Sequence, residues 1–376
     1  MPTIPVNTPS GTVHFSYTIS TPREASAKTL EAGLPTLLFI HPAYFSSIVY
    51  HAQFNDPRLR RFNLVTFDLR CSGFTTGARV KAPYELEDIA RDVVAFMNAL
   101  RLPPCHIVGL GTGTVIAINL ALHHASKCLS LCLLSPLGFP EYNPAIMEGV
   151  AQIHSLWKEG MANASNVDKS IIWDALSGLR QFGFNYMRGS SLGDALFQVW
   201  FTRALEIWGP DQESIDEFFE TTLGFFSYEK TFTRSASELK GIRVPVKVIQ
   251  GSENIINNWP AEYLDKMGEL LQQAGIRFDG SLISHAPHVL CVDHSETLNP
   301  IIHDFVLKVC RTPVPPPPSH VASPWEEMLR GVGYAPEDET DDELIIHHPT
   351  KVYHNSLACS MRNGLHASDD SDYYSS

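Results

Sequence analysis

The stretch HIVGLGTGTVIA at residues 106–117 decides the fold. With the preceding Cys105, its first residues form a short β-branched run that is typical of a buried strand, and the apolar stretch after residue 113 is typical of a helix. The glycine-rich turn GLGTG joins the two, and its central residue is Gly111. A strand, a tight turn and a helix in this order usually present a side chain at the turn. Here the turn presents a residue that has none.

Continuous apolar runs recur on both sides of this stretch. Residues 36–40 (TLLFI), 63–68 (NLVTFD) and 130–135 (SLCLLS) are runs of this kind, and an amphipathic helix is predicted over residues 85–102. Strands that are apolar throughout, alternating with helices, are typical of a parallel sheet covered on both faces. The sequence therefore predicts the α/β class.

A long helical block interrupts this alternation before strand-like runs resume near residue 244. We predict a core formed by residues 1–139 and 241–311, with a helical cap inserted at residues 140–240. Aromatic side chains of the insertion are candidates to line an apolar pocket, although packing of the cap on the core explains each of them more simply. These side chains are Trp200, Phe201, Trp208, Phe218, Phe219, Phe225 and Phe226.

The composition changes sharply after Lys308. Residues 312–376 open with the polyproline run PVPPPPS and continue as a polar, acidic and serine-rich sequence, which predicts a stiff linker followed by a disordered tail. The segment SPWEEML at residues 323–329 has the pattern of a helix start, and we expect a transient helix without a partner there. A protein that binds this tail is the remaining candidate for a macromolecular partner.

The composition excludes several classes of protein. The 376 residues carry a formal net charge of −13 and no basic stripe, which argues against nucleic acid as a partner. The seven cysteines are an odd set without a CxxC pair, as expected for free thiols in a reducing compartment. We see no signal peptide and no apolar run long enough to span a membrane. We therefore expect a cytoplasmic protein that needs neither a metal nor a cofactor.

Five loop motifs resemble those of the α/β-hydrolase superfamily, in the family's order. FIHPAYFSS at residues 39–47 is similar to the oxyanion loop, DLRCSGFTTG at 68–77 to the loop written Asp-x-x-Gly-x-Gly-x-Ser, and residues 106–113 to the nucleophile elbow. VIQGSENIINNWP at 248–260 is similar to the acid-bearing loop, and HAPHVLCVDHSE at 285–296 to the histidine loop. The resemblance implies an α/β-hydrolase fold, with a mostly parallel central sheet and an inserted helical cap.

The same resemblance implies a degenerate catalytic triad. The chemistry of the family needs a serine that attacks a carbonyl, a histidine that takes its proton, and a carboxylate that orients the imidazole. In this sequence Gly111 occupies the nucleophile position and Asn254 the acid position. Only the histidine, His288, is retained. The backbone N–H groups of Ala43 and Thr112 correspond to the two oxyanion donors and could still hold a carbonyl oxygen.

Some side chains near these positions could substitute for the missing groups. Glu253 is a carboxylate one residue before the expected acid position, and Thr112 and Thr114 carry the hydroxyls nearest to the elbow. We expect none of them to act, because neighbouring side chains point in different directions. A dinucleotide loop is a weaker interpretation of GLGTG, since its fingerprint requires glycine where Thr114 stands.

Two classes of function follow. The retained histidine and oxyanion loop favour a divergent enzyme that acts on a small apolar carbonyl or ester-like compound, by histidine-assisted hydrolase, lyase or cyclase chemistry. The alternative is a non-catalytic ligand-binding or scaffold pseudohydrolase, because the N-myc downstream-regulated proteins are similar in having a glycine-rich elbow without serine. In either case we expect the small molecule to lie beneath the cap.

Overall fold

The computed structural model describes residues 1–137, 144–163, 165–185, 190–224, 234–257, 259–310 and 312–336. The chain divides into two compact units, Met1–Ala335 and Pro336–Ser376. The description below concerns the first unit.

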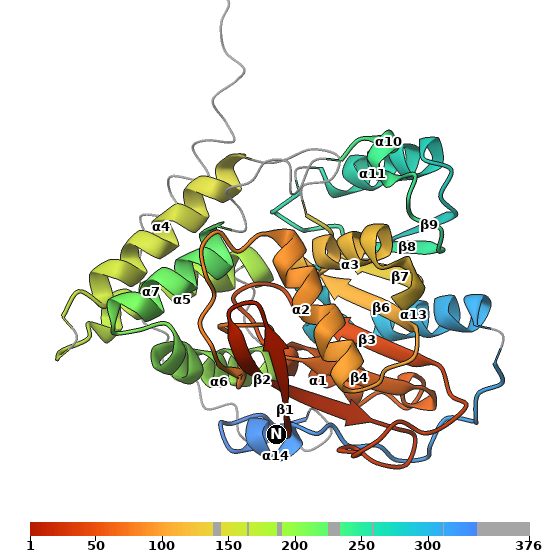
Figure 1. The fold of residues 1–376 in the computed structure, drawn as a ribbon, viewed down its shortest axis with the longest axis horizontal. Coiled ribbons are helices and arrows are strands. Elements are labelled where there is room, and N and C mark those ends of the chain that lie inside the picture. The colour runs from red at the N-terminus through yellow and green to blue at the C-terminus, as the bar shows by residue number, and fades with distance from the viewer. Residues whose placement is uncertain are drawn as a thin grey trace, which may run out of the picture. The chain divides into compact units, whose positions relative to one another are not determined.

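One sheet of nine strands forms the centre of the described part of the chain, in the order β1-β2-β4-β3-β6-β7-β8-β9, with β5 paired to β2 (Figure 1). The strands are β1 (Thr3–Thr8), β2 (Gly11–Ser20), β3 (Thr36–Ile40), β4 (Asn63–Phe67), β5 (Thr76–Gly77), β6 (Cys105–Leu110), β7 (Cys128–Leu134), β8 (Val246–Gly251) and β9 (Phe278–Ile283). β2 is antiparallel to β1, β4 and β5, whereas every pairing from β4 to β9 is parallel. The predicted, mostly parallel sheet is confirmed.

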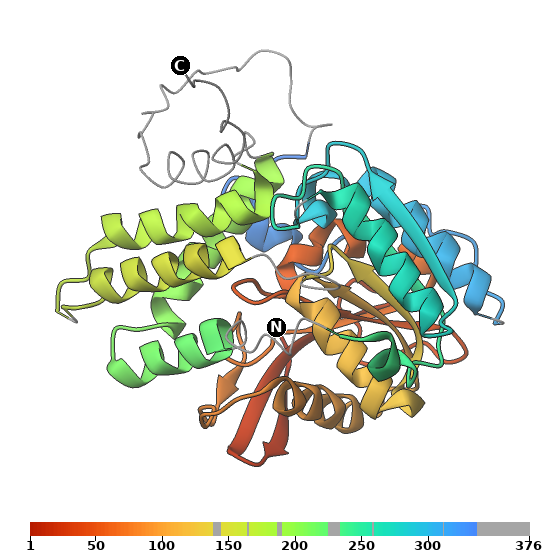
Figure 2. The same ribbon diagram turned by 90° about the horizontal axis from the view of Figure 1, so that it is seen from above.

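Helices cover both faces of this sheet. α2 (Leu86–Ala99) and α3 (Thr112–His123) pack together on one face, and α13 (Ser295–Val309) lies with α1 (His51–Phe54) on the other (Figures 1 and 2). The other helices of the core are η1 (Ser47–Tyr50), η2 (Leu59–Arg61), η3 (Ala125–Lys127), α11 (Pro260–Gln273), α12 (Leu290–Asp293) and α14 (Glu326–Arg330).

The sequence explains these elements locally. Every residue of β3, β4 and β6 is buried, as expected of strands covered on both faces. α2 begins at a capping box, in which Glu85 and Asp88 accept each other's backbone N–H groups, and it buries Ile89, Val93 and Phe96 on one side.

The helical block lies between β7 and β8, which are neighbours in the sheet. Its elements are α4 (Pro144–Gly160), α5 (Lys169–Phe184), α6 (Ser191–Ile207), α7 (Gln212–Phe219), the π-helix η4 (Glu220–Gly224) and α10 (Ala236–Leu239). α4 and α5 lie side by side, and α4–α7 stand to one side of the core (Figure 2), whereas α10 packs on α11. The polypeptide therefore leaves the sheet after one strand and returns to the adjacent one.

The aromatic side chains of the insertion pack mainly on one another. Trp208 stacks on Phe218 with ring centroids 4.3 Å apart, and the Trp157 indole donates a hydrogen bond to the Trp208 carbonyl at 2.9 Å. Trp200 stacks on Phe45 of the core at 5.4 Å. Phe225 and Phe226, two of the side chains predicted to be candidates for a pocket, lie outside the described residues.

The first part of the predicted linker and tail packs with the core. Residues 312–335, expected to be a linker and part of a disordered tail, belong to the first compact unit. Trp325 is fully buried against Phe54, and Leu329 of α14 is buried beside it. The prediction failed because a tryptophan in an acidic, proline-rich segment can bury its ring where a distant part of the core offers a site. Residues 337–376, the rest of the predicted tail, lie outside the described residues.

The described part of the chain contains six of the seven cysteines, all with free thiols, and four of them are buried: Cys105, Cys128, Cys132 and Cys291. Within the same residues no helix has the length and apolar character needed to cross a membrane.

Candidate active site

The turn after β6 has the geometry of a nucleophile elbow. β6 ends at Leu110 and α3 begins at Thr112, so that Gly111 alone forms the turn, with φ 53° and ψ −119°. This left-handed conformation strains any residue with a Cβ atom, and glycine adopts it freely. Gly113 lets the turn approach β3, because a Cβ atom there would stand 2.2 Å from the Ile40 carbonyl oxygen. The turn is retained while its side chain is absent.

His288 occupies the space that a side chain on Gly111 would need. A Cβ atom built on Gly111 would lie 2.9 Å from His288 Nε2 and 3.2 Å from Pro42 Cβ. The His288 side chain is buried, and its ring edge faces the elbow. The retained histidine and the substituted nucleophile position therefore lie together, as the resemblance implied.

The other ring nitrogen of His288 lacks an orienting group. Nδ1 is buried and forms no hydrogen bond with any residue that the structure describes. Burial lowers the pKa of His288 from 6.5 to about 3, because water is no longer available to stabilise the imidazolium. The ring is therefore neutral at physiological pH.

The hydrogen bonds of the Asn254 side chain go to residues other than His288. Asn254 Nδ2 donates to Gln250 Oε1 at 3.0 Å, and its Oδ1 accepts the Ile256 N–H at 3.0 Å. The side-chain amide is thus used inside its own loop. Glu253 is equally separate, since its carboxylate lies 2.8 Å from Nδ1 of the exposed His285 and faces solvent.

The threonine hydroxyl groups beside the elbow also form hydrogen bonds within the protein. Thr112 Oγ1 accepts the Ala43 N–H at 2.6 Å, and Thr114 Oγ1 donates to the Gly111 carbonyl at 2.6 Å. The Ala43 N–H, expected to be available for an oxyanion, therefore binds a side chain of the protein itself. The Thr112 N–H lies in the first turn of α3, where backbone donors have no intrahelical acceptor.

A small apolar pocket of about 60 Å³ opens beside His288. α4 and α5 of the insertion form its roof and the oxyanion loop forms its floor. The residues that line the whole pocket are Pro42, Ala43, Tyr44, Phe45, Thr112, Leu137, Ile146, Val150, Leu179, Phe182, Gly183, Ile256 and His288. None of the five described aromatic candidates, Trp200, Phe201, Trp208, Phe218 and Phe219, is among these residues.

The sequence contained a signal for the true roof. Ile146 and Val150 are four residues apart on α4, and Leu179 and Phe182 are three apart on α5. Such spacings place each pair on one helical face. The spacing of these two pairs, rather than the size of the side chains, therefore indicates the residues that roof the pocket.

A comparison with protein families finds a match to part of the chain. Residues 33–179 match the model of the alpha/beta hydrolase fold family. This segment contains the loop at residues 39–47, the turn at Gly111, α4 and most of α5. The chain has the α/β-hydrolase fold.

Two curated proteins illustrate the similarity within the superfamily. "Putative carbamate hydrolase RutD" of Caulobacter segnis is 33% identical over 81 residues, which are 22% of this chain and 30% of that protein. The 2-hydroxy-6-oxo-6-phenylhexa-2,4-dienoate hydrolase of Burkholderia cepacia is 33% identical over 96 residues, 23% of this chain and 34% of that protein. The matched segments span only about a third of the length of these relatives.

Solved structures of the superfamily cover most of the chain. A thermophilic esterase from Thermogutta terrifontis superimposes with a TM-score of 0.60 at 17% identity, covering 82% of this chain and 99% of that one. The enol-lactonase from Burkholderia xenovorans gives a TM-score of 0.57 at 18% identity, with coverages of 78% and 97%. At these identities the likeness shows the fold alone.

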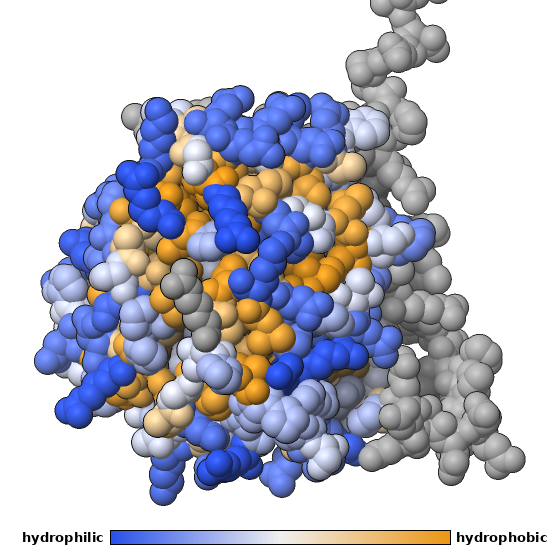
Figure 3. Space-filling view, turned by 90° about the vertical axis from the view of Figure 1, so that its right-hand side faces the viewer, coloured by the Kyte–Doolittle hydropathy of each residue, from blue (hydrophilic) through white to orange (hydrophobic). Residues whose placement is uncertain are grey.

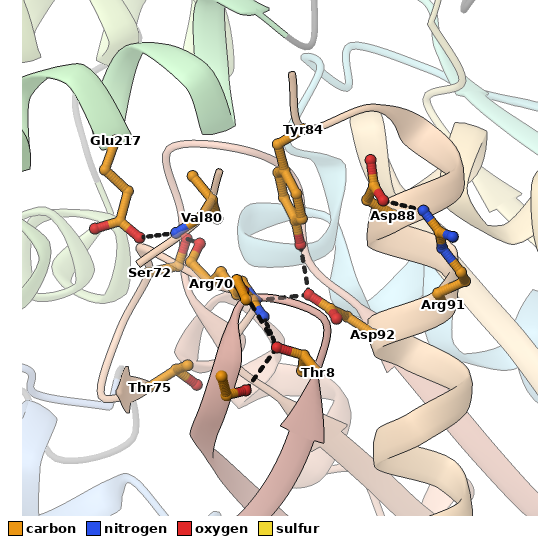
Figure 4. Close-up of polar contacts among 12 residues, drawn as sticks. Thr8, Arg70, Ser72, Thr75, Val80, Tyr84, Asp88, Arg91, Asp92 and Glu217 are labelled. Atoms are coloured by element: carbon orange, nitrogen blue, oxygen red, sulfur yellow. Dashed lines mark hydrogen bonds and ion pairs between the residues drawn. The ribbon is translucent and has the colours of Figure 1, made fainter. Parts of the chain in front are cut away.

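Buried polar contacts fix the position of the loop that resembles the superfamily's Asp-x-x-Gly-x-Gly-x-Ser motif. Arg70 lies on this loop, and its Nε stands 2.7 Å from an Asp92 carboxylate oxygen on α2 (Figure 4). The Tyr84 hydroxyl donates to the same carboxylate at 2.8 Å, and Arg70 also bonds Thr8 of β1. These buried contacts join the loop, the β1–β2 hairpin and α2 into one rigid support.

The same region fastens the insertion to the core. Glu217 of α7 accepts the Val80 N–H at 2.9 Å (Figure 4), and Glu220 of η4 accepts the Tyr84 N–H at 2.6 Å. Carboxylates of α7 and η4 thus accept hydrogen bonds from backbone donors of the core. Within the described residues, no group of histidine, cysteine and acidic side chains is arranged to hold a metal ion.

Proposed function

We propose that this chain is a non-catalytic member of the α/β-hydrolase superfamily that binds a small, uncharged, mostly apolar carbonyl compound beside His288. The observation that carries the proposal is the relation of His288 to Gly111. No side chain at the elbow can attack a carbonyl, and the histidine ring takes up the room of the missing nucleophile.

The electrostatics of His288 argue against catalysis by the histidine alone. A general base must accept a proton in the transition state and works best when its pKa lies near the operating pH. The pKa of His288 is about 3, and no described carboxylate reaches its Nδ1. In serine proteases, replacing the orienting carboxylate by an amide alone costs about 10⁴ in rate.

The pocket suits a very small ligand. Its volume of about 60 Å³ exceeds the roughly 10–15 Å³ that one water needs, and it is below the roughly 150 Å³ of a cavity that takes up benzene. No charged side chain is among its described lining residues. A carbonyl oxygen could accept hydrogen bonds from the Thr112 N–H and from His288, while α4 and α5 contact the apolar part.

Titration with 2-butanone, followed by the ¹⁵N signals of the imidazole rings, tests the proposal. We expect a saturable shift of the His288 signals in the wild-type protein. We expect binding to be lost in Val150→Phe, which fills the pocket, and to persist in His285→Ala, whose side chain is 78% exposed. Equal binding by Val150→Phe and the wild type would overturn the proposed site.

The second candidate is a divergent enzyme that uses His288 as its only proton acceptor. It is favoured by one observation, the direction of His288 Nε2 toward the elbow at the edge of the pocket. This candidate requires turnover that disappears in His288→Ala without covalent labelling by a serine-directed fluorophosphonate. The binding proposal requires no turnover in either protein.

A further inference from the structure

We propose that the chain has a second ligand site that binds a small uncharged aromatic alcohol. This site is a groove at the amino ends of the parallel strands, whereas the His288 pocket lies at their carboxyl ends. The groove has a volume of about 670 Å³, within the roughly 300–1,000 Å³ typical of ligand sites. It is far larger than the pocket of about 60 Å³ beside His288.

The amino ends of four neighbouring parallel strands form the floor of the groove. Thr36, Asn63, His106 and Leu129 line it, and they lie at the starts of β3, β4, β6 and β7. The His288 pocket lies at the carboxyl ends of the same strands. The two sites are therefore separated by the length of the sheet, and the second does not depend on the proposed function of the first.

Two buried polar side chains at the floor lack partners. His106 Nε2 and Thr36 Oγ1 form no hydrogen bond with any described residue, and the two residues are only 2% and 1% exposed. A buried polar atom without a partner destabilises the folded protein, and a ligand that bonds it recovers this loss. Since both atoms lie below the surface, the polar group of the ligand must reach the floor of the groove to form hydrogen bonds with them.

The protonation of His106 indicates the kind of polar group. Its Nδ1 lies 2.8 Å from the Ser130 hydroxyl, which can donate or accept, so Nε2 is an acceptor in one tautomer and a donor in the other. Burial lowers the pKa of His106 to about 4, which keeps the ring neutral. A ligand hydroxyl satisfies either tautomer, because it both donates and accepts.

The walls indicate an uncharged, flat and apolar body. They include Leu34, Pro35, Pro103, Pro104 and Leu129, and Leu129 is 44% exposed. Figure 3 shows hydrophobic surface across the middle of the face at which the parallel strands begin. Such rigid apolar walls suit an aromatic ring.

The charge of the groove argues against an anion. Glu31 is the one charged residue among its described lining residues, and its carboxylate is paired with Arg23 at 3.3 Å. The loop that carries Glu31 is held in place by Asn63, whose Oδ1 accepts the Glu31 N–H at 2.9 Å and whose Nδ2 donates to the Glu31 carbonyl at 3.0 Å. This wall is thus formed before a ligand arrives.

Calorimetric titration with 1-naphthol tests the site, with naphthalene and 1-naphthoate as matched compounds. We expect 1-naphthol to bind at least 10-fold more tightly than either, and Leu129→Glu to weaken it at least 10-fold. Leu282→Glu, at a 43% exposed position of β9 outside the groove, should leave the affinity unchanged. The His106 ¹⁵N signals should shift on binding.

Two results would overturn the second site. One is equal affinity for naphthalene and 1-naphthol, which would show that no buried hydrogen bond is made. The other is an unchanged affinity in Leu129→Glu, which would show that the compound binds elsewhere. Val150→Phe, which closes the His288 pocket, should have no effect, so failure of one site can be told from failure of the other.

Discussion

His288 Nε2 lies 2.9 Å from the point where a Cβ atom of residue 111 would stand, and Gly111 supplies no such atom. In the chemistry of the superfamily, these two positions hold a base and the nucleophile that it activates. Here the base has moved into the space of the nucleophile. The residue at position 111 and the placement of the His288 ring are therefore coupled, because a side chain restored at position 111 requires the ring to withdraw.

Gly111→Ser should destabilise the protein without creating an esterase. Serine at φ 53° carries backbone strain of about 1–3 kcal/mol, and its Cβ displaces the His288 ring. Adding Asn254→Asp should not rescue activity, since residue 254 faces Gln250. Urea unfolding and hydrolysis of p-nitrophenyl acetate measure the two effects. A 10-fold gain in hydrolysis by the double variant would show that the site still assembles readily.

Thr112→Val should destabilise the protein by about 1–3 kcal/mol. Valine keeps the shape of threonine but leaves the Ala43 N–H without its acceptor at 2.6 Å. Thr112→Ser retains the hydroxyl and is the matched control. Urea midpoints of the three proteins provide the measurement, and equal midpoints for Thr112→Val and Thr112→Ser would contradict the assigned hydrogen bond.

Stability should fall as the pH is lowered from 6.5 to 5. Four buried histidines have pKa values lowered by desolvation to about 3 or 4, and these are His51, His106, His154 and His288. The unfolded chain binds protons on them near pH 6.5 while the folded chain does not, so each contributes a loss of about 1.6 kcal/mol over this interval. The pKa values of Asp92 and Glu217 are raised by desolvation and act in the opposite sense.

Urea unfolding between pH 7.5 and 5 measures this dependence. His288→Gln should reduce the slope of the unfolding free energy against pH by the equivalent of about one bound proton. His285→Gln, at an exposed position, should not change this slope. A stability that stays constant from pH 7.5 to 5 would contradict the burial of these rings.

Trp325→Ala should cost about 3–5 kcal/mol, the usual range for removal of a fully buried tryptophan. The loss removes the contact with Phe54 and the anchor of residues 312–335. Trp259→Ala is the control, because that side chain is 78% exposed. If both variants unfold at the same urea concentration, the segment around Trp325 does not pack as described.

Features set by local sequence could be predicted. The elbow, the parallel strands and the loop of His288 each depend on a short motif, and the structure has these elements where the sequence places them. The orientation of side chains could not be predicted. Whether Thr112 bonds Ala43, or Asn254 bonds Gln250, depends on how loops distant in sequence meet.

Composition predicted the wrong environment for one segment. The acidic, proline-rich character of residues 312–335 outweighed the single Trp325, whose partner Phe54 is distant in the chain. For the aromatic residues of the insertion, packing was the simpler expectation, and Trp208 and Phe218 do pack on each other, while aliphatic residues such as Val150 line the pocket. Burial depends on tertiary contacts that composition does not encode.

The most direct test of the central claim is the rate of p-nitrophenyl acetate hydrolysis by the wild-type protein and by His288→Ala, with His285→Ala as the exposed control. A site that binds without turnover predicts the same rate for all three proteins. A wild-type rate well above that of His288→Ala, with His285→Ala unchanged, would contradict the account and establish His288 as a catalytic residue.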